Sequence, residues 1–327
     1  MLRTRFTEMF GLDYPVMSAP MAMHSGGTLA AAVSAAGGLG SFGGVNRTKG
    51  SDWLQGEIDR IRAKTGRPFG VGFVTAFLPM FQGHFAAALE SRAPVIALSF
   101  GVPTKAIEQA KVAGATVMCQ VQSIEHAHEA AAAGADILVA QGNEAGGHTG
   151  AMNLLPLLTQ VIDAFPQLPV LAAGGIASGR ALAAVLAAGA DGAWAGTTFL
   201  ATPKCTEVPD EHKQLIVESD GEDTVYTRAY DVLFGAPWPA GIAERGRRND
   251  FTDEWDGRDA EIVKNRESLT AQVLEAERNF DPARRAVLYG QSAGAVHSVR
   301  PAAEVLRSIC DDAERILRDR AAAVLGS

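Results

Sequence analysis

A glycine-rich segment with a single histidine, at positions 141–150, is the part of the chain best suited to carry chemistry. It reads QGNEAGGHTG and follows the apolar run 135–140, which is typical of a buried strand. Glycines let the main chain approach a ligand closely, and an imidazole exchanges protons near neutral pH. The combination predicts a catalytic loop at the end of a strand, with His148 as the reactive group. A hydrogen bond that only braces the loop is the alternative role for His148.

Other arrangements that could carry chemistry are weak in this sequence. Cys119, Cys205 and Cys310 lie far apart, and the predicted strand ends carry almost no charge, so no metal site is predicted. The stretch GQSAG at 290–294 is only superficially similar to the nucleophile elbow of hydrolases, because no convincing core strand precedes it. His24 follows the first predicted strand and could line a pocket, although the pattern favours a surface position.

The elements that must position this loop repeat one unit along the first two thirds of the chain. An alanine-rich amphipathic stretch ends at a glycine, which is typical of the left-handed position that closes a helix, and a short apolar run follows. Repetition of this unit predicts βα units with a parallel sheet. The apolar runs are eight in number and lie at 15–21, 39–43, 69–74, 95–100, 116–121, 135–140, 169–173 and 192–198.

Eight such units predict an α/β fold of the (β/α)8 TIM barrel type. An open, doubly wound sheet is the alternative, but it would more often show a GxGxxG turn after its first strand, and the chain has APMA at 19–22. Two glycine turns, Gly174-Gly175 and Gly196-Thr197, follow the last two predicted strands. The loops at these places in a TIM barrel commonly bind phosphate through main-chain N–H groups. Glycines that only relieve crowding at the barrel rim are the alternative.

The repeat ends after the eighth run. Charged residues gather at 250–261, the motif PWP at 237–239 interrupts any regular helix, and helical patterning resumes at 261–279 and 301–325. We expect the last of these helices to pack back on the barrel. The pattern predicts two domains, a smaller and mainly helical cap inserted after strand eight, at 207–285, and the barrel domain, at 1–206 and 286–327.

Composition and charge restrict the class of protein. A chain of 327 residues with 47% apolar and 20% charged residues is typical of soluble globular proteins with a large core. The net charge of −8 argues against a nucleic-acid surface. The start of the sequence lacks the apolar region of a signal peptide, no apolar run has membrane-spanning length, and three cysteines suit a reducing compartment. We therefore expect a cytoplasmic protein that binds neither nucleic acid nor a membrane.

Five stretches, taken in order, resemble the nitronate monooxygenase family, also described as 2-nitropropane dioxygenase-like flavoproteins. The match covers most of residues 3–205 and touches a short stretch near 289–294. Its motifs are the opening 4–22, the segment 31–40, the histidine loop 141–150 and the two glycine turns at 174–175 and 196–197. The resemblance implies a barrel that binds FMN across its strand ends, but these motifs separate the subgroups of the family poorly.

The resemblance also implies roles for individual residues. His148 would face the flavin where substrate stacks, and Ser292 would approach the same pocket as a second catalytic residue. The residues implied in FMN binding are Ala19, Pro20, Met21, Ala22, Gln120, Gln141, Gly146, Gly147, Gly174, Gly175, Gly196, Thr197 and Gln291. Two positions depart from the family pattern, because many relatives have Asn where this chain has Gly72 and some have Lys near Gln120. A neutral amide gives a hydrogen bond about half as strong as that of a charged donor.

Three functions follow from the resemblance. The first is an FMN-dependent nitronate monooxygenase, which oxidises an alkyl nitronate with O2 to a carbonyl compound and nitrite, with His148 bonding the substrate or accepting its proton. The second is an FMN-dependent reductase that uses NAD(P)H to reduce an enoyl thioester or a quinone, since such barrels share these motifs. The third is a flavin-binding protein without catalysis, against which the pocket histidine argues.

Overall fold

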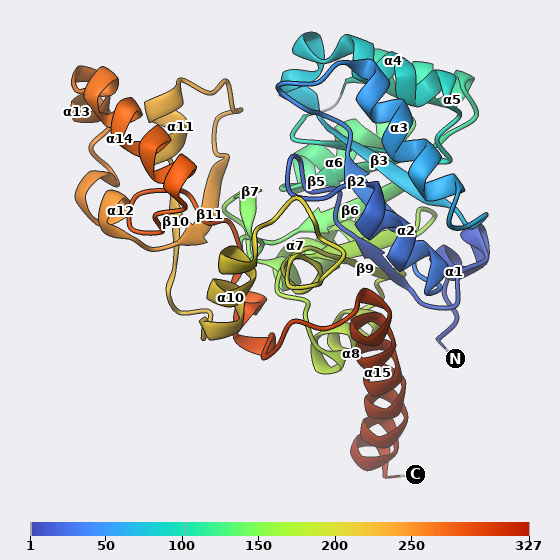
Figure 1. Cartoon of the computed structure of the whole chain (residues 1–327). Coiled ribbons are helices and arrows are strands. Elements are labelled where there is room, and N and C mark those ends of the chain that lie inside the picture. The colour runs from blue at the N-terminus through green and yellow to red at the C-terminus, as the bar shows by residue number, and fades with distance from the viewer. Residues whose placement is uncertain (1, 102, 327) are drawn as a thin grey trace.

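The computed structural model describes residues 2–101 and 103–326, and in this part of the chain eight parallel strands form one sheet. The order of the strands across the sheet is β1-β9-β8-β6-β5-β4-β3-β2. Helices cover its outside (Figure 1). The strands are β1 (Val16–Ser18), β2 (Gly40–Gly43), β3 (Phe69–Val74), β4 (Val95–Ser99), β5 (Thr116–Val121), β6 (Ile137–Gln141), β8 (Val170–Ala173) and β9 (Gly192–Ala195).

The sheet closes on itself, because its two end strands meet. The N–H of Leu39, just before β2, donates to the carbonyl oxygen of Val16 at 3.0 Å, and the N–H of Ser18 donates to the carbonyl oxygen of Leu39 at 3.1 Å. The predicted TIM barrel is therefore confirmed, and the open doubly wound sheet is wrong. The predicted strand runs 15–21 and 192–198 extend too far, since the main chain turns away at Ala19 and Gly196.

The repeated glycine closes helices as the pattern predicted. Gly114, Gly134 and Gly189 follow outer helices and have φ of +84°, +94° and +103°. The outer helices are α2 (Gly27–Ala35), α3 (Ser51–Arg62), α4 (Gln82–Glu90), α5 (Thr104–Val112), α6 (Ile124–Ala132), α7 (Leu154–Ala164) and α8 (Gly179–Ala187).

Two apolar cores hold the barrel together. One lies between the strands and the outer helices. The other fills the barrel interior, where Met17, Met118 and Leu171 are buried, and where Phe6 of α1 (Arg5–Phe10) is fully buried against them. These large side chains fill the interior of the barrel, so a ligand can bind only at one of its ends.

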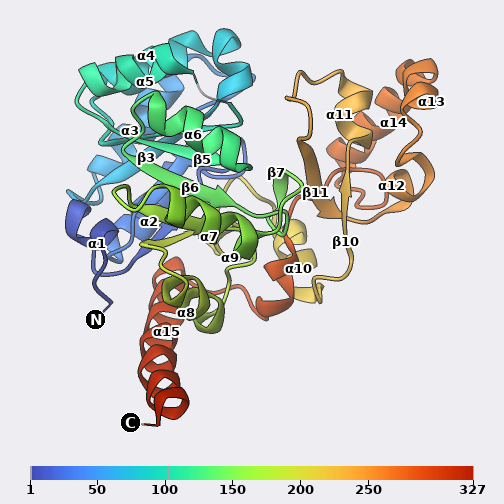
Figure 2. The same ribbon diagram turned by 180° about the vertical axis from the view of Figure 1, so that it is seen from behind.

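Residues 207–285, the predicted cap, lie to one side of the barrel (Figures 1 and 2). They form a small core of their own around Tyr230, Phe251 and Leu269. Their elements are α10 (Asp210–Glu218), β10 (Thr224–Thr227), α11 (Ala229–Phe234), β11 (Ala243–Arg247), α12 (Asp250–Trp255), α13 (Asp259–Lys264) and α14 (Arg266–Asn279). The domain boundaries themselves stay a prediction.

A second, antiparallel sheet joins this region to the barrel. Its order is β10-β11-β7, and β7 (Gly147–Thr149) belongs to the histidine loop that leaves the barrel after β6. The prediction had placed a plain loop there. The strand forms because β11, distant in sequence, supplies hydrogen-bond partners to the 147–149 main chain.

The chain returns to the barrel after α14. It passes η2 (Gln291–Ala295) and ends in α15 (Ala302–Leu325), which packs against α8 as expected from the sequence. The two helices approach closely, since a Cβ at Gly179 would lie 2.3 Å from the Cβ of Asp312. None of the helices in residues 2–101 and 103–326 combines the length and apolar character needed to cross a membrane.

Candidate functional site

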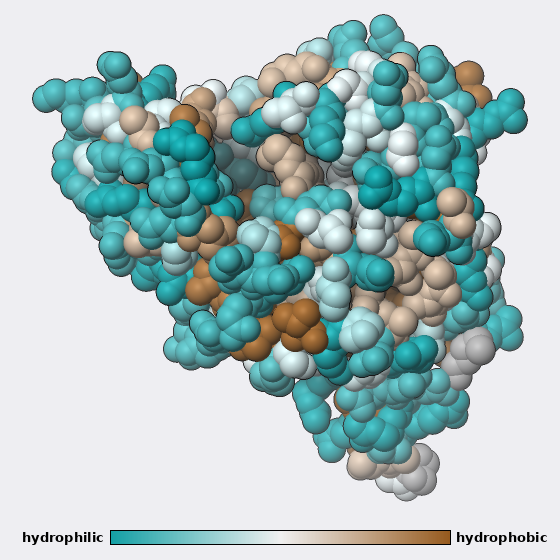
Figure 3. All heavy atoms as spheres, viewed as in Figure 1, coloured by the Kyte–Doolittle hydropathy of each residue, from teal (hydrophilic) through white to brown (hydrophobic). Residues whose placement is uncertain are grey.

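A cavity of about 1100 Å³ lies over the carboxyl ends of the barrel strands. Its walls come from the strand ends, from the histidine loop and from the side of residues 207–285 that faces the barrel. The space-filling view shows the surface hollowed between these two parts of the molecule (Figure 3). Active sites of this fold lie at this end of the barrel, so the cavity is the candidate site.

All but one of the residues predicted for the site line this cavity. Those that do are His148, Ser292, Ala19, Pro20, Met21, Ala22, Gln120, Gln141, Gly146, Gly147, Gly174, Gly175, Gly196 and Thr197. Gln291 is the exception, because its side chain is exposed and is not part of the cavity wall. Its main-chain N–H donates instead to the carbonyl oxygen of Glu144 at 3.0 Å. His24, which the sequence pattern had favoured as a surface residue, is half-buried and lines the cavity.

One corner of the cavity has the main-chain geometry that a phosphate needs. Gly174 and Gly175 have φ of +98° and +71°, a conformation that glycine adopts without strain. Gly196 precedes the short helix α9 (Thr197–Leu200), whose first turn has no side-chain cap. Free N–H groups at such turns bind anions, and no acidic side chain caps them here.

The C-terminal segment closes the same corner. The hydroxyl of Thr197 accepts a hydrogen bond from the N–H of Gly290 at 3.0 Å. The main chains at Gly146 and Gly290 touch, because a Cβ at Gly146 would lie 2.4 Å from the Gly290 nitrogen. This packing brings Tyr289 and Ser292 to the cavity wall.

Three glutamine side chains form a hydrogen-bonded network next to the histidine loop. The Gln122 amide nitrogen donates to the side-chain oxygen of Gln141 at 3.0 Å, and more weakly to that of Gln120 at 3.5 Å. The Gln141 amide nitrogen donates to the carbonyl oxygen of His148 at 3.0 Å. Gln141 therefore positions the histidine loop, while the Gln120 amide nitrogen is left to face the cavity.

Gly72, one of the two departures from the family pattern, has a steric explanation. A Cβ at this position would lie 2.4 Å from the Cγ of Pro20. The Pro20 ring thus takes the space that an asparagine side chain would need. Any ligand contact at this point of the rim must therefore come from other groups.

His148 is held on three sides. Its Nε2 lies 2.9 Å from Oδ1 of Asp231, which comes from α11. The indole of Trp238 stacks on the imidazole, with ring centres 3.6 Å apart and planes inclined by 17°. Phe100 approaches edge-on at 6.5 Å. Because Asp231 accepts this hydrogen bond, Nε2 carries the hydrogen and Nδ1 is left as the basic atom.

A second carboxyl group lies next to this pair. Glu244 of β11 is the cross-strand partner of His148, and its Oε2 is 3.9 Å from Nε2. The side chain is 5% exposed. Burial raises the pKa of Glu244 well above its ordinary value, and the charges of Asp231 and Glu277 raise it further.

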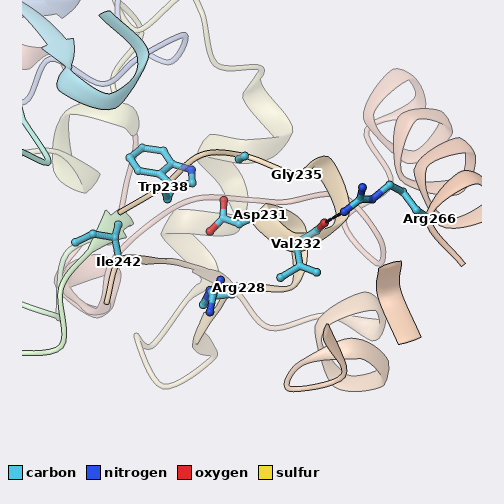
Figure 4. Close-up of a pocket in the computed structure, with 8 residues that line it drawn as sticks. Arg228, Asp231, Val232, Gly235, Trp238, Ile242 and Arg266 are labelled. Atoms are coloured by element: carbon cyan, nitrogen blue, oxygen red, sulfur yellow. Dashed lines mark hydrogen bonds between the residues drawn. The ribbon is translucent and has the colours of Figure 1, made fainter. Parts of the chain in front are cut away.

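A smaller cavity of about 260 Å³ is lined by Asp231, the hydrogen-bond partner of His148, and by Trp238 (Figure 4). Asp231 and Trp238 line both cavities, so they separate one from the other. Arg228 and Arg266 contribute to the wall of the smaller cavity, where Arg266 donates to the carbonyl oxygen of Val232 at 3.0 Å.

The sequence pattern did not identify Asp231, Trp238 or Glu244 as site residues. All three lie in the charged region after the barrel strands, where acidic residues are common and none is marked by a local motif. Only Trp238 was marked by a local sequence pattern, because a tryptophan between two prolines is unusual in such a segment. The two carboxylates are identified only by the folding that brings them to His148.

Comparison with known proteins agrees with the barrel and the site. The family model described as nitronate monooxygenase matches residues 3–81 and 73–312. A Mycobacterium tuberculosis protein named (3aS,4S,5R,7aS)-5-hydroxy-7a-methyl-1-oxo-octahydro-1H-indene-4-carboxyl-CoA dehydrogenase is 36% identical over 232 residues. That alignment covers 70% of this chain and 64% of the mycobacterial protein, so a third of the relative lies outside the match.

Two solved structures resemble the whole chain. FabK from Thermotoga maritima superposes with a TM-score of 0.88 at 31% identity, covering 99% of this chain and 100% of FabK. A nitroalkane oxidase from Streptomyces ansochromogenes gives a TM-score of 0.80 at 30% identity, covering 97% of this chain and 99% of the oxidase. The fold, the site and these matches describe a flavin-dependent oxidoreductase that acts on small molecules, and the chain belongs to the nitronate monooxygenase family.

Proposed function

We propose that this protein is an FMN-dependent nitronate monooxygenase that oxidises alkyl nitronates with O2 to a carbonyl compound and nitrite. The observation that carries the proposal is the His148–Asp231 hydrogen bond of 2.9 Å on the wall of the strand-end cavity. The resemblance to a nitroalkane oxidase over the whole chain supports the substrate class.

The cavity fits FMN. Gly174, Gly175, Gly196 and Thr197 offer the phosphate uncapped main-chain N–H groups, and Gln120 offers the ring system an amide donor. The bound flavin supplies the electron acceptor for the substrate and the electron donor for oxygen. All other contributions come from the side chains of the protein.

His148 supplies proton transfer. With its Nε2 hydrogen donated to Asp231, Nδ1 can accept a proton from a nitroalkane or hydrogen-bond the oxygens of a nitronate. The imidazolium formed in the first case is stabilised by the Asp231 carboxylate. Trp238 covers one face of the imidazole and keeps water from it. Ser292 lines the cavity and offers a hydroxyl to the substrate.

A reductase that uses NADH or NADPH on an enoyl thioester or a quinone is the second candidate. The cavity of about 1100 Å³ favours it, since a small nitronate beside a flavin leaves much of this volume unused. The 36% identity to a protein named as an octahydro-indene carboxyl-CoA dehydrogenase points to a substrate of this size. Membership of an oxidoreductase family gives no support to the third interpretation, a flavin-binding protein without catalysis.

Anaerobic reduction of the flavin tests the proposal. Purified protein loaded with FMN is mixed in parallel with a nitronate, NADH and NADPH, and the bleaching of the flavin absorbance is followed. Fast bleaching by the nitronate alone supports the monooxygenase. Fast bleaching by a pyridine nucleotide, with none by the nitronate, replaces it with the reductase. Protein that is colourless and takes up no added FMN contradicts both.

A further inference from the structure

Three titratable groups from three different elements lie close together in the wall of the main cavity. They are His148 of β7, Asp231 of α11 and Glu244 of β11, and one ligand atom of each lies within 4.8 Å of the other two. The two carboxyl side chains are almost completely buried, with 9% of Asp231 and 5% of Glu244 exposed. Because Glu244 is the cross-strand partner of His148, the pairing of β7 with β11 holds these side chains together.

Each carboxyl group has one buried oxygen that forms no hydrogen bond within the described residues. Oδ1 of Asp231 bonds His148, but Oδ2 of Asp231 and Oε1 of Glu244 have no hydrogen-bond partner among the described residues. An unpaired charged oxygen in a buried position is costly. If both groups were ionised, two negative charges would lie side by side and two oxygens would remain unpaired.

No strong cation compensates this charge within the described part of the chain. Arg245, next to Glu244, donates to Asn143 and Thr224, and Arg285 pairs with Glu277 at 3.0 Å. Apart from His148, the groups that act on Glu244 are Asp231 and Tyr230 of α11 and Glu277 of α14. Arg228 and Arg266 lie on the wall of the smaller cavity, and neither forms an ion pair with Asp231 among the described residues (Figure 4).

A single proton removes both problems. Protonated Glu244 becomes a hydrogen-bond donor, and the Asp231 carboxylate, which has an oxygen within 4.8 Å of a Glu244 oxygen, is an acceptor for it. A carboxylic acid and a carboxylate that share a site divide one proton in this way, because like charges at such short range cannot both ionise. The raised pKa of Glu244 agrees with this arrangement.

We propose that Asp231 and Glu244 form a carboxyl–carboxylate pair that shares one proton and thereby keeps a single negative charge beside His148. This inference rests on the proposed role of His148 in proton transfer. With Glu244 neutral, Asp231 remains the acceptor of the Nε2 hydrogen, and Nδ1 stays free for the substrate. Glu244 acts through Asp231 and is therefore a positioning residue.

Asp231 lines both cavities, while Glu244 lines only the main one. The pair therefore lies in the wall of the main cavity, and Asp231 also reaches the smaller one.

Infrared spectroscopy tests the shared proton directly. Difference spectra of the wild type, Glu244→Gln and Glu277→Gln are recorded as a function of pH, with and without FMN. We expect the wild type and Glu277→Gln to show a protonated carboxyl band at neutral pH that Glu244→Gln lacks. Glu277→Gln makes the same isosteric change at a carboxylate of α14, and because the charge of Glu277 raises the pKa of Glu244, this variant is expected to keep the band but to lose it at a lower pH than the wild type.

The pH dependence of anaerobic flavin reduction tests the effect on His148. The wild type and Glu277→Gln are expected to show an ionisation on the alkaline side, where Glu244 loses its proton. Glu244→Gln, which stays neutral at every pH, is expected to lose this ionisation, so that its rate no longer changes on the alkaline side. A variant that only damaged the structure would lose rate at every pH.

Several outcomes overturn the inference. One is a wild-type spectrum without a protonated carboxyl at neutral pH, and another is a band that persists in Glu244→Gln. A third is activity that EDTA abolishes and Mn²⁺ restores, because the three groups would then hold a cation in place of the proton. If no substrate reduces the flavin, the proposed function fails, but the infrared result still decides whether the proton is shared.

Discussion

The imidazole of His148 is placed by one hydrogen bond and one stacked ring, and both come from outside the barrel. The Asp231 carboxylate bonds Nε2, and the Trp238 indole covers one face of the ring. A histidine held in this way has one tautomer and one orientation, which is what general acid–base catalysis requires.

Replacement of the imidazole tests its role. We expect His148→Ala to keep FMN, because no phosphate contact depends on this side chain, and to lose a factor of about 10²–10⁴ in the rate of substrate oxidation. The measurements are the flavin content and the single-turnover rate of flavin reduction. His297→Ala, at an exposed position that does not line the cavity, serves as control. Undiminished turnover in His148→Ala would remove the proposed role.

The buried Glu244 carboxyl should make the stability of the protein depend on pH. Below its ordinary value of 4.5 the group is protonated in both the folded and the unfolded state. Above that value the unfolded chain releases the proton while the folded protein keeps it, so the free energy of unfolding falls as pH rises toward the raised native pKa. In Glu244→Gln this fall should be absent. Denaturant unfolding of both proteins between pH 4.5 and 9 measures it, and parallel curves would contradict it.

At the scale of elements, the turns after β8 and β9 are proposed to hold the phosphate. Their glycines serve two purposes that substitution can separate, namely backbone conformation and open space for the ligand. Gly175 is suited to this test because a Cβ there would meet no protein atom closer than 3.7 Å, although its φ is +71°. Gly114 has a similar φ of +84° and no atom within 4 Å, but it does not line the cavity.

We expect Gly175→Ala and Gly114→Ala to lose about the same stability, roughly 1–2 kcal/mol, because both place a side chain in the left-handed region. Only Gly175→Ala should also lose FMN affinity, by about tenfold or more, which corresponds to about 1.4 kcal/mol. Thermal unfolding of the apoproteins and titration with FMN give the two quantities. Equal FMN affinity in both variants would show that the turn does not bind the phosphate.

The helix α10 is joined to the C-terminal segment by a buried histidine. Nε2 of His212 donates to the carbonyl oxygen of Leu288 at 3.1 Å, and the side chain is 1% exposed. Burial is the main cause that lowers the pKa of His212 to about 4, and the nearby His24 contributes. The folded protein therefore favours the neutral form of the His212 imidazole.

Acid should weaken this junction. Between pH 6.5 and 4 the unfolded chain binds a proton at His212 that the folded protein does not bind, so stability falls as pH falls through this window. At about 1.4 kcal/mol per pH unit, the full loss is about 3 kcal/mol. We expect His212→Gln to show a flatter pH dependence of unfolding than the wild type and His297→Gln, which changes an exposed histidine. Identical curves for the three proteins would refute this expectation.

At the scale of the whole molecule, the site lies between the barrel and residues 207–285, which contact each other at several points. The β7–β11 pairing joins them behind the histidine. In front of it, Trp238 makes edge-on contacts with Phe77 at 5.0 Å and Phe100 at 5.1 Å, both of which belong to the barrel side of the cavity. Trp238 therefore covers the histidine and connects the two parts at once.

We expect Trp238→Ala to raise KM and to lower kcat/KM, since it opens the cavity to water and removes a stacking contact of about 0.5–1.5 kcal/mol. Trp53→Ala removes a tryptophan that packs on Phe42 and His84 away from the cavity, and it should lower stability without this kinetic change. Steady-state kinetics and thermal unfolding of both variants provide the comparison. Unchanged kinetics in Trp238→Ala would show that the indole does not cover the working site.

The sequence by itself determined the barrel and most of its rim. Helices α2, α5, α6 and α8 are followed by glycines with positive φ, and the strands are apolar runs, so the repeat can be recognised from neighbours in the chain. The residues at the strand ends then lie at one end of the barrel by necessity, which is why the predicted phosphate turns and His148 share a cavity.

Only the tertiary structure decided which groups surround His148. Asp231 lies 83 residues further along the chain, in a region where acidic residues are frequent and no local pattern distinguishes one from another. The strand around His148 forms because β11 pairs with it, and that pairing carries Glu244 into a buried position. A raised pKa depends on burial and on neighbouring charges, and both are properties of the folded molecule that the order of residues does not express.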